Sequence, residues 1–137
     1  MRNILAIVFG LIIGGFLVGL SETIAYTLFP GDMAFPAALA DRHMYMEQIP
    51  FTAQLSVIIG WASGAFIAGV VTTLIQGRTD YRIPLITVGV LQLFAWMNMI
   101  SFPHPGWMWV AGSLVFVPLG LLAYVFFRKR PGQGAEY

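Results

Sequence analysis

Glu22 is the side chain in this sequence with the strongest claim to chemistry, because it lies within a long apolar stretch. Apolar residues fill positions 4–20 almost without a break, and a largely apolar run resumes over 24–29. An ionised carboxylate that faced lipid would cost several kcal/mol, so Glu22 is expected to point into protein or water. Two roles remain open: a carboxyl that pins helices together, and a site that handles protons or cations.

Other polar and aromatic side chains fall at the depth of Glu22 if successive helices run antiparallel. Glu22 lies about 10 Å below the outer end of its helix, at 1.5 Å per residue. Trp61 lies near the start of the second apolar stretch, Asn98 near the end of the third, and His104 in the connection that follows. The sequence therefore predicts an outer-leaflet polar pocket made of Glu22, Trp61, Asn98, His104 and Trp107.

His104 stands between two prolines, where a hydrogen bond to Glu22 or to a backbone carbonyl is the expected role. The chain has two histidines and no cysteine, so we predict no metal site. A haem held by both histidines is not expected either, since His43 and His104 lie outside the apolar stretches. The sequence contains no Ser-His-Asp set, P-loop or dinucleotide fingerprint. We assign no catalytic residue and expect no cofactor.

Composition indicates an integral membrane protein. The 137 residues are 58% hydrophobic and 9% charged, whereas soluble domains average about 25% charged residues. Such a chain cannot cover a water-facing surface, and its length suits one domain. The net charge of +1 is uninformative about nucleic acid, but no basic cluster is interleaved with aromatic residues as a binding groove would require, so no nucleic-acid partner is expected. The expected partner is the lipid bilayer.

Four apolar stretches are long enough to cross a bilayer, which requires about 20 residues. The predicted spans cover about residues 4–29, 54–75, 85–101 and 107–127. The first is too long for a typical signal-peptide core and lacks a following Ala-x-Ala site, so a retained span is expected. The fold class is predicted as all-α: a single four-helix transmembrane domain over residues 1–130, followed by a disordered tail at 131–137.

Glycines on the first two spans predict a close helix contact. Gly15 and Gly19 lie on the same helix face as Glu22, and Gly60 and Gly64 repeat at a spacing of four in the second span. Small residues let two helix backbones approach closely. We expect these four glycines to line the contact and turn Glu22 inward.

The hydrophilic stretch between the first two spans is expected to hold a short helix from Pro36 to Ile49, ended by Pro50. Its apolar positions favour a helix lying at the membrane interface. The alternative is a lid over a ligand site.

Basic residues predict the orientation. Arg42 lies on one side of the predicted spans, and six basic residues lie on the other: Arg2, Arg78, Arg82, Arg128, Lys129 and Arg130. The positive-inside rule then places both termini in the cytoplasm of a bacterial host.

The stretch from Asn98 to Trp109 resembles a large family of short bacterial four-span membrane proteins. In that family the third and fourth helices meet at an Asn-x-x-x-x-Pro-His-Pro-x-Trp turn, which here runs from Asn98 to Trp107. The opening Ile-Leu-Ala-Ile-Val-x-Gly and Gly60-Trp61-Ala62-x-Gly64 fit the same family. The resemblance covers the chain to about Arg130 and implies a four-span fold in the bacterial inner membrane, but no reaction.

These observations favour a non-enzymatic inner-membrane protein that acts as an accessory or scaffold bundle, with the polar pocket as its functional surface. It would work as a homo-oligomer or within a larger membrane complex. One alternative is a small proton-coupled transporter that acts as an oligomer, with Glu22 as its proton site. A weaker one is a quinone-binding or enzymatic subunit that uses Glu22 and His104 as an acid-base pair.

Overall fold

The computed structural model describes residues 1–32, 34 and 36–129, and over these residues it is entirely helical. Four helices are long and apolar enough to cross a membrane, which confirms the predicted class and span count. They are α1 (Arg2–Leu28), α3 (Phe51–Gln76), α4 (Arg82–Ser101) and α5 (Gly106–Phe127). A 3-10 turn (Leu39–Asp41) and the short helix α2 (Arg42–Gln48) lie between α1 and α3.

Prolines and one glycine account for several helix ends. Pro50 and Pro105 directly precede α3 and α5. Gly77 caps the C-terminal end of α3, with a left-handed φ of 101°. We predicted that α4 begins after Pro84, but it begins at Arg82. The reason is that proline is tolerated in the first helical turn, where its missing N–H has no partner to lose.

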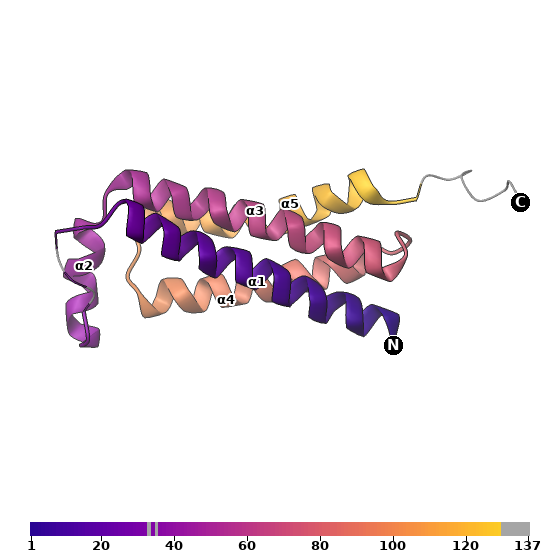
Figure 1. The fold of residues 1–137 in the computed structure, drawn as a ribbon, viewed down its shortest axis with the longest axis horizontal. Coiled ribbons are helices and arrows are strands. Elements are labelled where there is room, and N and C mark those ends of the chain that lie inside the picture. The colour runs from indigo at the N-terminus through magenta and orange to yellow at the C-terminus, as the bar shows by residue number, and fades with distance from the viewer. Residues whose placement is uncertain (33, 35, 130–137) are drawn as a thin grey trace, which may run out of the picture.

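The helix α3 is at the centre of the bundle. It packs against α1, α5 and α4, and α4 also contacts α1 and α5. Helix α1 begins and α5 ends at one end of the bundle, while α2 lies at the other end and runs across the long axis (Figure 1). The main core groups Trp61 of α3 and Phe116 of α5, both fully buried, with Met99 of α4 and Met108 of α5.

The close contact between α1 and α3 is made by glycines that differ in part from those we predicted. A Cβ atom at Gly64 would lie 2.7 Å from Val18 Cγ2 and 3.0 Å from the Gly14 carbonyl oxygen, and one at Gly60 would overlap the Ser21 side chain. A Cβ at Gly19 would meet no atom within 4 Å.

On α1, then, Gly14 and the equally crowded Gly10 approach α3, instead of Gly15 and Gly19. A Cβ at Gly15 would make only an ordinary contact with Leu91 of α4, 3.9 Å away. The prediction for these two glycines is wrong because α1 is rotated so that the Gly10–Gly14 row faces α3. Gly19 is left exposed at the gap between α1 and α4.

The connection between α1 and α3 forms less helix than predicted. Instead of one helix from Pro36 to Ile49, the chain makes a 3-10 turn and the seven residues of α2. Tyr45 and Met46 of α2 are buried and pack with Ile49 and Ala53. The side chains of α2 therefore cover the end of the bundle. The predicted tail at 131–137 lies outside the described residues.

Candidate functional site

Glu22 joins three helices through one carboxyl oxygen. Trp61 of α3 donates its indole N–H to Glu22 Oε1 at 2.6 Å, and the Asn98 amide of α4 donates to the same oxygen at 3.1 Å. The sequence predicted Glu22, Trp61 and Asn98 in one pocket; the structure joins the three by hydrogen bonds, but fully buried Trp61 does not line the cavities described below. Hydrogen bonds to a charged acceptor are among the stronger ones in proteins. Glu22 thus ties α1 to both α3 and α4.

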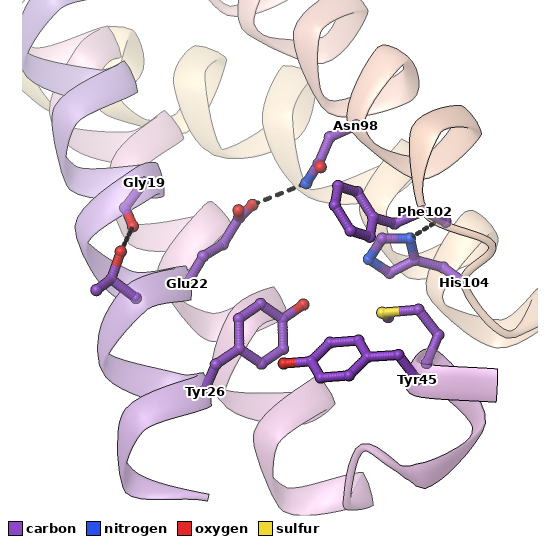
Figure 2. Close-up of a pocket in the computed structure, with 9 residues that line it drawn as sticks. Gly19, Glu22, Tyr26, Tyr45, Asn98, Phe102 and His104 are labelled. Atoms are coloured by element: carbon purple, nitrogen blue, oxygen red, sulfur yellow. Dashed lines mark hydrogen bonds between the residues drawn. The ribbon is translucent and has the colours of Figure 1, made fainter. Parts of the chain in front are cut away.

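A cavity of ≈ 240 Å³ lies beside this carboxyl. Its wall includes Glu22 and Tyr26 from α1, Tyr45 from α2, Asn98 from α4 and His104 from the connection between α4 and α5 (Figure 2). Gly19, Thr23, Met46 and Phe102 complete the lining. The wall thus draws on helices that are far apart in the sequence.

His104 lies in this wall without a hydrogen bond to Glu22. Its Nδ1 pairs with the backbone carbonyl of Phe102. Of the two partners expected from the sequence, Glu22 and a backbone carbonyl, the structure therefore shows the backbone carbonyl. Burial lowers the pKa of His104 below its ordinary value, while the Phe102 and Met99 carbonyls act in the opposite direction. The ring is therefore neutral at pH 7. Because Nδ1 faces an acceptor and carries the proton, Nε2 presents a lone pair.

Trp107 does not line this cavity. Its indole N–H donates to Gln54 Oε1 at 3.2 Å, and its ring packs against Phe51 at a centroid distance of 5.2 Å. Gln54 in turn donates to the Ile49 carbonyl at 3.1 Å. Trp107 therefore belongs to a neighbouring set of contacts that holds the start of α5 to the start of α3.

The pocket contains side chains that sequence reasoning did not assign to it. Tyr26 lies four residues after Glu22, so it shares the helix face of Glu22, and that spacing could have indicated it. Tyr45 and Met46 of α2, by contrast, reach the cavity only through the path of the connection between α1 and α3. Nothing in their local sequence marks them as pocket residues.

The arrangement offers hydrogen bonding and charge, without an evident catalytic set. Over the described part of the chain, no group of three His, Asp or Glu side chains could hold a metal ion. The hydroxyl of Thr23 donates to the Gly19 carbonyl at 2.9 Å, and His104 Nδ1 is engaged by Phe102. Comparison with family models, curated proteins and solved structures gives no match for this chain.

Proposed function

We propose that this chain is a non-enzymatic integral membrane protein that binds a small membrane-soluble molecule in the cavity beside Glu22. One observation carries the proposal. The carboxyl of Glu22 is held by donors from α3 and α4, yet Glu22 still lines a cavity of ≈ 240 Å³. A carboxyl needed only to join helices would not require an open volume of this size next to it. Pockets of this kind, mostly apolar with a few convergent polar groups, are typical binding sites.

A small proton-coupled transporter is the second candidate. It is favoured by the position of Glu22, which also lines a second cavity of ≈ 280 Å³ between α1 and α4. A carboxyl between two cavities could interact with a solute moving from one to the other. This function would require the chain to act as an oligomer, because a single bundle of this size offers few helices to rearrange.

A native mass spectrum of the protein released from gentle detergent tests the binding proposal. We expect a bound small molecule on the wild-type chain and on Gly89→Leu, and its loss from Gly19→Leu. Gly19 lines the cavity and Gly89 does not, while a Cβ at either position meets no atom within 4 Å. Equal retention by both variants would contradict a site in this cavity. A dimer carrying the ligand would favour the transporter.

We also propose that the protein lies in the inner membrane of a bacterium. Its N-terminus and its C-terminus would then both face the cytoplasm. Arg2, Arg78, Arg82, Arg128 and Lys129 lie at the ends of the spanning helices opposite α2, whereas Arg42 lies at the start of α2. The Lys129 amide donates to the Arg78 carbonyl at 3.0 Å, which brings two of these basic residues together. This asymmetry follows the positive-inside rule.

A reporter enzyme that is active only outside the cytoplasm tests this orientation. Fused to the C-terminus, it should give no activity, because Arg128 and Lys129 retain that end inside. Inserted after Gly31, between α1 and α2, the same reporter should be active. The reverse pattern would overturn the orientation.

A further inference from the structure

Two acceptor atoms of the Glu22 cavity, Glu22 Oε2 and His104 Nε2, lack a donor among the described residues. The N–H donors of Trp61 and Asn98 both end on Glu22 Oε1, and over the described residues no donor pairs with Oε2. His104 is 8% exposed, and its Nε2 is buried without a hydrogen-bond partner among the described residues. A buried lone pair left unpaired costs free energy. A ligand head group with N–H or O–H donors would satisfy both acceptors.

The cavity has an acidic side chain with no Lys or Arg beside it. Among the described residues that line it or the adjoining cavity, Glu22 is the one acidic side chain and none is Lys or Arg. The Arg42 guanidinium lies 4.3 Å over the Phe102 ring and donates to the Ser101 carbonyl, but Arg42 does not line the cavity. A carboxylate with no cation in its own cavity favours a positively charged ligand.

Aromatic rings surround the same space. Tyr26, Tyr45 and Phe102 contribute rings to the cavity, and in Figure 2 the Tyr26 hydroxyl points toward its middle while the Tyr45 hydroxyl points toward Tyr26. Aromatic faces attract organic cations through the ring quadrupole, and cages of such rings are a common way of binding ammonium groups. The rings therefore favour the same charge as Glu22 does.

An apolar groove continues from the cavity along the bundle. The second cavity shares Gly19, Glu22 and Asn98 with the first and is otherwise lined by apolar side chains, including Leu91, Phe94 and Phe116. It lies between α1 and α4, where exposed Phe94 borders it. A hydrocarbon chain attached to a head group in the first cavity would lie along this groove.

We propose that the ligand of this site is an organic ammonium carried on an apolar chain. The ammonium N–H groups donate to Glu22 Oε2 and His104 Nε2 within the rings of Tyr26, Tyr45 and Phe102, and the chain follows the groove between α1 and α4. This inference rests on the proposed binding function and adds the chemical class of the ligand. A neutral hydroxyl head group has one O–H, so it would satisfy one of the two acceptors, and it carries no charge to stabilise an ionised Glu22.

Three probes that differ in the head group alone test the ligand class: octylammonium, octanol and octanoate. The protein is held in nanodiscs of phosphatidylcholine at pH 7, with empty nanodiscs correcting for partition into lipid. Binding is followed by the NMR signal of the Trp61 indole N–H, which contacts Glu22. Trp61→Phe identifies that signal among the four tryptophans.

Octylammonium should bind saturably and at least about tenfold more tightly than octanol, because its charge adds attraction to the Glu22 carboxylate and to the faces of the rings. Octanoate should bind weakest. Glu22→Gln, which keeps an acceptor oxygen but removes the charge, should weaken octylammonium binding by about tenfold and change octanol binding little.

Tighter binding of octanol than of octylammonium would overturn the ammonium inference and leave the proposed binding function in place. So would an affinity for octylammonium that does not change in Glu22→Gln. If none of the three probes bound saturably, the inference and the proposed function would both be contradicted.

Discussion

Replacing Glu22 with Ala should lower the free energy of unfolding by about 2–3 kcal/mol, because two donors lose their common acceptor. The indole N–H of Trp61 and the amide of Asn98 both end on Glu22 Oε1, and Trp61 is fully buried. The fully buried Trp61 indole would lose its acceptor outright, whereas Asn98 lines both cavities and is only partly buried. The loss would be measured by equilibrium unfolding in mixed detergent micelles.

Glu22→Gln should cost less than half as much as Glu22→Ala. The amide oxygen of Gln can accept the same two hydrogen bonds, although it lacks the charge that strengthens them. Thr27→Ala is the matched control on the same helix, since Thr27 is exposed and its hydroxyl bonds only to the Thr23 carbonyl of its own helix. Its effect should stay within about 0.5 kcal/mol.

If Glu22→Ala were as stable as Thr27→Ala, the carboxyl would not hold the helices together. The hydrogen bonds from Trp61 and Asn98 would then contribute nothing measurable to the free energy of unfolding. A Glu22→Gln variant as unstable as Glu22→Ala would show instead that the charge is what stabilises the bundle. The two variants therefore separate hydrogen bonding from charge, a distinction that neither substitution makes alone.

Gly64→Leu should destabilise the bundle by about 3 kcal/mol or prevent its folding, because the added side chain has no space. A Cβ added at Gly64 would by itself lie 2.7 Å from Val18 Cγ2 and 3.0 Å from the Gly14 carbonyl oxygen. The backbones of α1 and α3 would have to separate. Thermal unfolding in detergent, followed by circular dichroism, measures the loss.

Gly19→Leu and Gly89→Leu are the matched controls for this packing effect. A Cβ at Gly19 of α1 or Gly89 of α4 would meet no atom within 4 Å, so leucine can be accommodated there. The substitution also replaces glycine with a residue of higher helix propensity. Both variants should melt at or above the wild-type temperature. A Gly64→Leu protein that melted with them would show that α1 and α3 are not in close contact at this position.

The all-helical class, and the number and approximate bounds of the four apolar helices, could be predicted from the sequence. The physical reason is that a bilayer imposes one length and one apolar composition on every span, and both can be counted along the chain. The shared depth of Glu22, Trp61 and Asn98 could also be inferred, because helix rise and antiparallel order place residues along the membrane normal.

Which faces of the helices meet could not be predicted from the sequence and is known from the packing of the folded chain. A span that is apolar all round carries no strong signal of its inward face, so the sequence could not rank Gly14 above Gly19. The rotation of α1 places Gly14 against α3 and leaves Gly19 at the cavity. In the same way, Trp107 turned out to bind Gln54, and Tyr45 reached the pocket from a connection whose path no local pattern specifies. Depth follows from counting residues, but orientation follows from packing between side chains that are distant in the sequence.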